Sequence, residues 1–379
     1  MSEKKEMTPR ERFMKCLSFE HVDRIPVMDF GYWGETIDEW HKQGLPKDVV
    51  TTEDVERYFG LDRGFETNLV NYWGDYGPVG IQWRVWPEWE KTLVDEDDEH
   101  WFYSLGDGGE LIESKTGSIP FQSKFPIETL DDFWAKIPSR TIPDDESRIL
   151  PSLDGMIQRG IKEQQAFGVW IEGFFAWPRL LMGPENTLVS YYEDPELMHT
   201  INRQHLWFVK EFIDKLVLPR TKLDYAFITE DMCYNHGCMI SPQTFDEFMK
   251  PYYLELVDFL HSRGMKKIIV DSDGNTVSLC DKLVEVGIDG HCPMEIKAGA
   301  YPEEIRKKHP KFAMIGGIDK LALAVDRAAI DKELAKLPPL LEQGGFIPAL
   351  DHRVQPGVPM ANYQYYIEEK RKLLEKYNS

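Results

Sequence analysis

The chain has 379 residues, of which 42% are hydrophobic and 12% aromatic, and its formal net charge is −21. A chain of this size and composition can bury a large core, and its negative charge disfavours nucleic acid or an anionic membrane surface as a partner. The longest apolar runs fall well short of the roughly 20 residues that a membrane-spanning helix requires. The charged N-terminus lacks the apolar stretch of a secretory signal, and the odd, scattered set of five cysteines indicates free thiols in a reducing compartment. We therefore expect a cytoplasmic protein.

The first elements are predicted to be a helix and a strand. Thr8 can cap a helix whose first position is Pro9, and Phe13 and Leu17 recur at helical spacing. An apolar segment at residues 24–29 follows and is expected to form the first strand.

The chain between about residues 74 and 120 has a different pattern. Short segments rich in aromatic and branched residues, at 81–86, 100–103 and 110–113, alternate with turn-rich stretches. This pattern predicts an antiparallel β meander inserted into the larger domain, where it would form a lid or a flank.

After Pro151 the order of apolar strand, polar strand end and helix repeats, which is typical of successive βα units and a parallel sheet. Ser241, Pro242 and Gly264, for example, would cap, start and stop one helix. No GxGxxG follows a strand, so a dinucleotide-binding sheet has no support. With the early strand and one more in the middle of the chain, the units approach eight, and we predict a single α/β domain over residues 1–379, a (β/α)8 TIM barrel. The strands expected in these units are residues 168–172, 225–230, 267–271, 287–291, 312–316 and 346–351.

Polar residues follow the predicted strands, and in a barrel of parallel strands these ends converge on one mouth. Asp271 and Asp273 lie two residues apart, so both carboxylates can face the same cavity. His352, just past the last strand, would add an imidazole, and Glu230 a further oxygen. This mixed set predicts a metal site for zinc, or else iron or manganese, with one position open for substrate.

Other acids at the strand ends have a plainer interpretation. Aspartate is favoured directly before a helix, so Asp231, Asp319 and Asp351 are expected to cap the helices that follow them. If many of these carboxylates faced one cavity, they would raise each other's pKa values, and a bound cation would offset this repulsion.

Large apolar and aromatic residues surround these acids. Such residues are most often core or pocket wall, and a mouth walled in this way suits a flat organic substrate better than a sugar or a phosphate. The candidate substrate-binding residues are Trp33, Trp170, Glu172, Phe174, Tyr234 and Met294.

Motifs spread over the whole chain carry a resemblance to a known family. They are Thr8-Pro-Arg-Glu-Arg-Phe with Asp23-Arg-Ile-Pro, Glu230 on its strand, Ser241-Pro-Gln-Thr-Phe with Lys250-Pro-Tyr-Tyr, Val270-Asp-Ser-Asp-Gly-Asn275, Ile315-Gly-Gly-Ile-Asp319, and Gly344-Gly-Phe-Ile-Pro through Pro359 and Asn362. In these motifs the chain resembles the uroporphyrinogen decarboxylase family, a barrel superfamily that includes decarboxylases of haem synthesis and corrinoid-dependent methyltransferases.

The two branches of that family imply different chemistry. The decarboxylases carry an arginine-bearing motif after the first strand, which neutralises the carboxylates of the tetrapyrrole, whereas residues 30–39 of this chain contain no arginine. An acidic floor without arginine would bind a substrate of many carboxylates very poorly. Only His352, which matches a histidine of those enzymes, favours decarboxylation of that substrate.

In the thiol-methylating branch, zinc is bound by His-x-Cys on one strand and by Cys on the last, and motif matching puts Asp271, Asp273 and His352 at these positions. Such harder ligands leave zinc more electrophilic, which suits activation of a methyl ether. The resemblance therefore implies a corrinoid-dependent methyltransferase that moves a methyl group from a small methoxylated, aromatic compound to the cobalt of a separate corrinoid protein. Asp271, His352 and Glu230 would be catalytic, with Glu230 as a further metal ligand or as a proton donor.

Two alternatives stay open. A metal-free decarboxylase of a small aromatic or pyrrolic acid would use Asp271 or Glu230 as proton donor, with His352 orienting the substrate. A non-catalytic binding protein that kept the fold is the second, because fold alone never fixes activity. The clustering of ionisable groups argues against this second alternative. Whether the chain forms a homodimer is not readable from the sequence.

Overall fold

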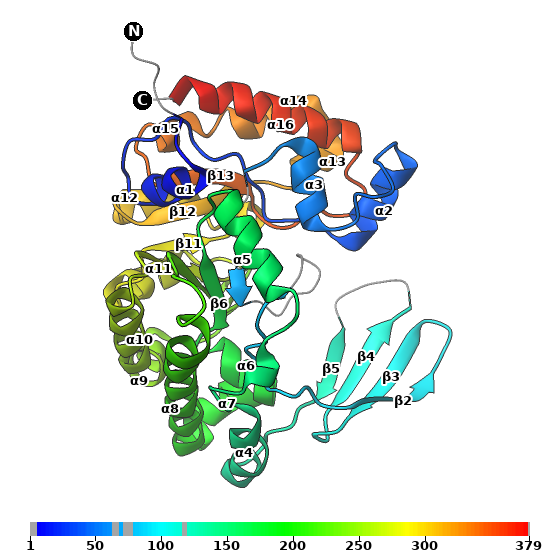
Figure 1. Ribbon diagram of the computed structural model, residues 1–379, viewed down its shortest axis with the longest axis vertical. Helices are drawn as coiled ribbons and strands as arrows, with labels where there is room; N and C mark the ends of the chain where they lie inside the picture. Colours follow the sequence, from blue (N-terminus) through cyan, green and yellow to red (C-terminus); the bar gives the residue numbers. More distant parts are fainter. Residues whose placement is uncertain (1–5, 63–67, 71–78, 116–119, 378–379) are drawn as a thin grey trace.

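A computed structural model describes residues 6–62, 68–70, 79–115 and 120–377. Among these residues, the main sheet has seven parallel strands that lie side by side in chain order (Figure 1). Helices alternate with the strands, which is the arrangement predicted for a TIM barrel. The strands are β1 (Asn68–Val70), β6 (Gly168–Glu172), β7 (Tyr225–Thr229), β10 (Lys267–Asp271), β11 (Gly290–Cys292), β12 (Ala313–Ile318) and β13 (Phe346–Leu350).

The predicted first strand is wrong in its detail. Residues 24–29 are not assigned to a strand, although Val27 O accepts the backbone N–H of Asp62 at 2.7 Å and Tyr32 forms an isolated parallel bridge with Val354. The physical reason is that Pro26 has no N–H to donate to a ladder, while the side chain of Asp29 accepts the N–H of Leu350 at 3.0 Å. The segment therefore lies along the seam beside β13 without regular strand pairing.

A buried ion pair fixes this seam. Asp29 is 1% exposed, and its carboxylate accepts hydrogen bonds from Tyr363 at 2.8 Å and Tyr366 at 2.9 Å, and contacts Lys370 Nζ at 3.2 Å. Lys370 is fully buried and also donates to the carbonyl of Met28 at 2.7 Å. A buried charge pair tolerates such burial only when its remaining donors and acceptors are satisfied, and here they are.

The helices cover the outside of the sheet and follow the local capping signals. The predicted first helix is confirmed, with Thr8 and Glu11 forming a capping box. The single helix expected after Ser241 is instead two helices with a break at Met249, because Pro251 cannot continue the hydrogen-bond ladder of the first. The helices are α1 (Pro9–Leu17), α2 (Gly34–Lys42), α3 (Thr52–Phe59), α4 (Leu130–Lys136), α5 (Leu153–Lys162), α6 (Ala176–Met182), α7 (Pro184–Glu193), α8 (Pro195–Phe212), α9 (Pro242–Phe248), α10 (Lys250–Ser262), α11 (Val277–Glu285), α12 (Pro302–Lys308), α13 (Ala322–Val325), α14 (Arg327–Leu334), α15 (Pro338–Leu341) and α16 (Met360–Leu374).

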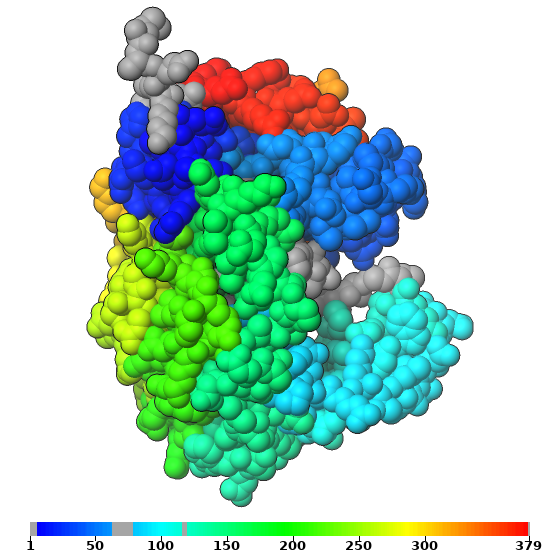
Figure 2. Space-filling view, in the orientation of Figure 1, coloured from blue at the N-terminus to red at the C-terminus, as the bar shows by residue number. Residues whose placement is uncertain are grey.

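The predicted meander is an antiparallel sheet of four strands, β2 (Lys91–Glu96), β3 (His100–Leu105), β4 (Glu110–Ser114) and β5 (Phe121–Lys124). Its last strand ends later than predicted, and residues 81–86 form no strand because Ile81 instead bridges Ile149. Residues 74–78 and 116–119 of the predicted range lie outside the described residues. The sheet stands out as a separate lobe at the edge of the molecule (Figure 2). Every residue of β2 is exposed, which fits a flank better than part of the core.

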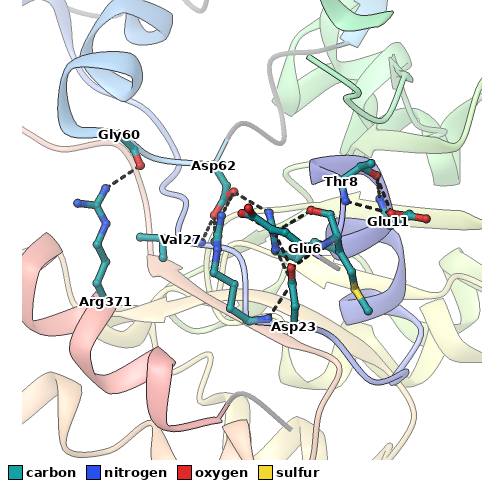
Figure 3. A network of polar contacts seen from close by, with 11 residues as sticks. Glu6, Thr8, Glu11, Asp23, Val27, Gly60, Asp62 and Arg371 are labelled. Carbon is teal, nitrogen blue, oxygen red and sulfur yellow. Dashed lines mark hydrogen bonds and ion pairs between the residues drawn. The ribbon is translucent and has the colours of Figure 1, made fainter. Parts of the chain in front are cut away.

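A polar network ties the N-terminal segment to the rest of the fold (Figure 3). The buried guanidinium of Arg12 donates to the two carboxylate oxygens of Asp23 at 2.8 and 2.9 Å, and Arg24 donates to Asp62 at 2.7 Å. Burial by itself would raise the pKa of Asp23, but the hydrogen bonds from Arg12 and from backbone N–H groups outweigh it and hold this pKa at about 2. The two N-terminal motifs of the resemblance therefore build structure.

Among the described residues, none of the helices has the length and apolar character needed to cross a bilayer.

Candidate active site at the strand ends

The register of the sheet aligns the carboxyl ends of its central strands. Glu172 of β6 pairs with Thr229 of β7, Thr229 pairs with Asp271 of β10, and Asp271 pairs with Cys292 of β11. Residues far apart in the sequence thus form one row across the sheet. Polar side chains at this edge are where enzymes of this architecture place their chemistry.

Asp271 is buried in the middle of this row, with 6% of its surface exposed. Thr229 donates to one of its oxygens at 3.3 Å, and the Cys292 thiol lies 3.9 Å from the other. Burial raises the pKa of Asp271 well above its usual range, and the nearby carboxylates of Asp231 and Asp273 raise it further. Asp271 therefore releases its proton at a higher pH than an ordinary aspartate does.

Two of the four predicted metal ligands, Asp273 and His352, lie in contact. The Nε2 atom of His352 lies 3.5 Å from the Oδ2 atom of Asp273. Burial and the neighbouring carboxylates of Asp231 and Glu295 raise the pKa of Asp273, whereas His352 opposes that rise. Both side chains keep some exposed surface, 40% for Asp273 and 22% for His352, so this pair is open to a ligand.

Trp33, predicted to bind substrate, lies beside this pair. Its ring stacks on the His352 ring with centroids 6.2 Å apart and 23° between the planes, and Phe30 lies 5.6 Å from the same imidazole. The guanidinium of Arg353 lies over the Trp33 ring, 5.0 Å from its centroid. A half-buried indole beside an imidazole offers a flat apolar surface next to a polar group.

Glu230 occupies a different position from the one predicted. Its carboxylate is fully buried and accepts the backbone N–H groups of Phe174, Phe175 and Ala176 at 2.8–2.9 Å, together with the hydroxyl of Tyr253. Burial raises its pKa to about 7, although all four donors act in the opposite direction. Both oxygens are engaged where the chain enters α6, so Glu230 organises this turn and does not join the pair of Asp273 and His352.

Two arginines at this edge were not foreseen. Arg84 donates to Glu172, and Arg179 pairs with Asp231 at 2.9 Å. Burial raises the pKa of Glu172, and Arg84 partly compensates. The expectation of a floor without arginine therefore holds for residues 30–39 but not for the strand ends, because residues from outside that stretch bring guanidinium groups to the acids. Each arginine is already matched with a carboxylate, so the two supply little free positive charge.

The other residues predicted to bind substrate differ in how far they are exposed. Trp170 is buried and donates its indole N–H to Thr229, which in turn holds Asp271. Phe174 and Met294 are fully buried, so they pack in the core and do not line an open pocket. Tyr234, by contrast, is 51% exposed.

None of the three acids caps the helix that follows it, contrary to the expectation. Asp319 accepts the backbone N–H of Leu321 at 2.9 Å in the turn before α13, whose N-cap residue Leu321 has no side-chain cap. Asp351 accepts the N–H groups of Ile296 and Lys320 at 3.0 Å, and neither belongs to α16, the helix that follows it. Asp231 instead adopts a left-handed backbone conformation, with φ of 47°, and belongs to the site through its contact with Arg179.

Comparison with protein families places the chain. The model of the family described as uroporphyrinogen decarboxylase (URO-D) matches residues 112–373. The chain belongs to this family.

Solved structures support the TIM-barrel fold of the URO-D family. A methyltransferase from Methanosarcina mazei is 14% identical, has a TM-score of 0.62, and the match covers 97% of this chain and 99% of that one. A putative vitamin-B12-independent methionine synthase from Listeria monocytogenes is 12% identical with a TM-score of 0.37, and the match covers 60% of this chain and 69% of that one, a likeness too slight to bear on the fold. Comparison with curated protein sequences gave no match.

The predicted zinc site requires three donor side chains that lie close together in this URO-D family member. Within the described ranges, no three or more His, Cys, Asp or Glu side chains are placed to hold a metal ion. Asp273 and His352 supply two donors in contact, but both oxygens of Glu230 are engaged by backbone N–H groups and by Tyr253. The described residues therefore do not fit the three-ligand site that we predicted, and zinc stays a prediction.

Proposed function

We propose that this URO-D family protein is a methyltransferase that takes a methyl group from a small methoxylated, aromatic compound. A corrinoid carried by a separate protein would supply the methyl acceptor. Membership in the URO-D family and the full-length likeness to a protein described as a methyltransferase support this choice. The residues at the strand ends give more specific support, because fold alone does not fix activity.

The observation that carries the proposal is the buried carboxyl group of Asp271 in the row of strand ends. When the methyl group leaves an aryl methyl ether for its acceptor, the electron pair of the broken C–O bond stays on the oxygen. A phenolate or alkoxide leaves far more readily if it gains a proton in the same step. Asp271 is a buried carboxyl whose pKa is raised by burial and by Asp231 and Asp273, and it sits at the strand ends, so it can give that proton.

The surrounding residues have consistent roles in this mechanism. The stack of Trp33 on His352 gives the aromatic ring of the donor a flat surface. Asp273 holds His352 in its orientation, and the carboxylates of Asp273 and Asp231 keep the proton on Asp271 until the oxygen needs it. After transfer, Asp271 is left as an anion beside two carboxylates, which favours its return to the protonated state.

The direct test is methyl transfer from a panel of methoxylated aromatics to cob(I)alamin, followed by the change in corrinoid absorbance. With an active donor, Asp271→Asn should lower kcat by about 10²- to 10⁴-fold, the usual contribution of general acid catalysis. Wild-type kcat should fall as pH rises through the elevated pKa of Asp271, and the variant should lose that dependence. Asp319→Asn, the same change at an acid that closes the turn before α13, should leave kcat within about twofold. Wild-type turnover by Asp271→Asn would refute the proposal.

A second candidate follows from the same proton. A decarboxylase needs an acid to protonate the carbanion that remains when carbon dioxide leaves, and Asp271 could serve that step as well. The URO-D family model favours this reading. Release of carbon dioxide from small aromatic or pyrrolic acids, without methyl transfer from any methoxylated compound, would decide for the decarboxylase.

A further inference from the structure

Beside the candidate active site lies a pair of cysteines to which the proposed reaction gives no role. Cys233 and Cys238 face each other across a small antiparallel hairpin made of β8 (Cys233–Tyr234) and β9 (Gly237–Cys238). Their sulfur atoms are in contact at 2.6 Å, and both are free thiols.

The backbone geometry of the hairpin allows a disulfide. The N–H of Met239 donates to the carbonyl of Met232 at 2.9 Å, so this outer pair is hydrogen-bonded and the Cys233–Cys238 pair is not. Non-hydrogen-bonded cross-strand pairs have Cα atoms about 4.5 Å apart, which lies within the 4.4–6.8 Å range found across disulfides. The two sulfurs can therefore join without movement of the main chain.

The pair is also chemically prepared for exchange. Cys238 is half-buried while Cys233 is buried, so a reagent from solution reaches Cys238 first. The hydrogen bond from Cys233 lowers the pKa of Cys238, which favours the attacking thiolate at that sulfur.

The hairpin touches the segment that carries the site. The N–H of Asn275 donates to the carbonyl of Tyr234 at 2.9 Å, and the N–H of Met232 lies 3.3 Å from the hydroxyl of Ser272. Gly274 packs so closely that a Cβ there would lie 2.6 Å from the backbone nitrogen of Tyr234. Any change in the rigidity of the hairpin is therefore passed directly to residues 271–275.

We propose that Cys233 and Cys238 form a reversible redox site that fixes the hairpin against residues 271–275. The oxidant would be a small-molecule disulfide such as glutathione disulfide. The Cys238 thiolate attacks one sulfur of that disulfide and expels one thiolate, and Cys233 then loses its proton and attacks the Cys238 sulfur, expelling the second. Two protein thiols are oxidised to one disulfide, and one small disulfide is reduced to two thiols.

The test uses the full-length native protein, treated with glutathione disulfide and then alkylated. Peptide mapping should find a Cys233–Cys238 link that dithiothreitol reverses, and amide hydrogen exchange in residues 231–240 and 271–276 should slow by at least threefold in the oxidised protein. Cys233→Ser should stop at a glutathione adduct on Cys238 with no change in exchange, whereas Cys16→Ser, a change at a buried thiol in α1, should behave like the wild type.

Two results would overturn the proposal. One is a wild-type protein in which both thiols remain free or Cys238 carries only glutathione. The other is a disulfide that leaves exchange in residues 271–276 unchanged. Neither measurement depends on methyl transfer, so each outcome is separate from the success of the proposed function.

Discussion

Gly173 is the residue at which the structure makes its sharpest stability prediction. A Cβ at this position would lie 2.1 Å from Oε1 and 2.2 Å from Cδ of Glu230, and 2.7 Å from the hydroxyl of Tyr253. In Gly173→Ala the Glu230 carboxylate must therefore withdraw, and Oε1 loses the N–H of Phe174 and the Tyr253 hydroxyl. Overpacking costs about 1–3 kcal/mol and each hydrogen bond to a charged group about 1.5–3 kcal/mol. We expect a loss of at least about 4 kcal/mol at pH 8, where Glu230 is ionised.

The assay is the free energy of unfolding from urea denaturation, measured for Gly173→Ala and for Gly155→Ala. Gly155 lies inside α5, and an added Cβ there meets nothing within 4 Å. The same chemical change should therefore stabilise this helix by about 0.5–1 kcal/mol. The two variants are matched in chemistry and opposite in sign. A loss below about 1 kcal/mol in Gly173→Ala would show that Glu230 does not occupy the cradle at the start of α6.

The remaining predictions concern acid stability, the buried seam and metal content. The pKa of Asp23 is about 2 in the folded protein against an ordinary value of 3.8. Up to about 2 kcal/mol of stability is therefore present above pH 4 and lost as the pH falls through 2. In Asp23→Asn, the free energy of unfolding should depend less on pH below pH 4. Lys370→Met leaves Asp29 buried without its cation and should cost about 3–5 kcal/mol, seen as a lower urea midpoint, and an unchanged midpoint would contradict the buried pair. Elemental analysis decides the metal prediction. About one zinc, iron or manganese per chain in the wild type and none in Asp273→Ala would support it, and absence of all three metals from the wild type would end it.

The sequence predicted the parallel strands well because buried strands such as β7 and β13 are continuous apolar runs that end in polar residues. It failed where local chemistry departs from these patterns. Residues 24–29 read as a strand, but Pro26 and the side chain of Asp29 replace ladder hydrogen bonds. Pro251 divided a helix that composition alone made continuous.

The site was predicted in part for similar reasons. Asp273, His352 and Trp33 came together because strand ends converge, which follows from topology. The sequence did not predict the position of Glu230, because its partners are backbone N–H groups, which no residue type identifies. Arg84 was missed since it arrives from outside the βα units. The spacing of Cys233 and Cys238 around Asn-His-Gly was the available signal for a hairpin that brings two thiols together.

The seam between residues 27–32 and β13 joins segments that lie far apart in the sequence. Asp29 and Lys370 are 341 positions apart, and Tyr32 and Tyr363, whose hydroxyls lie 2.6 Å apart, are separated by 331. During synthesis, Asp29 is made long before Lys370, because the two residues are 341 positions apart. A nascent chain interrupted before α16 would hold the carboxylate of Asp29 without Tyr363, Tyr366 and Lys370, so the seam would lack the ion pair that fixes it.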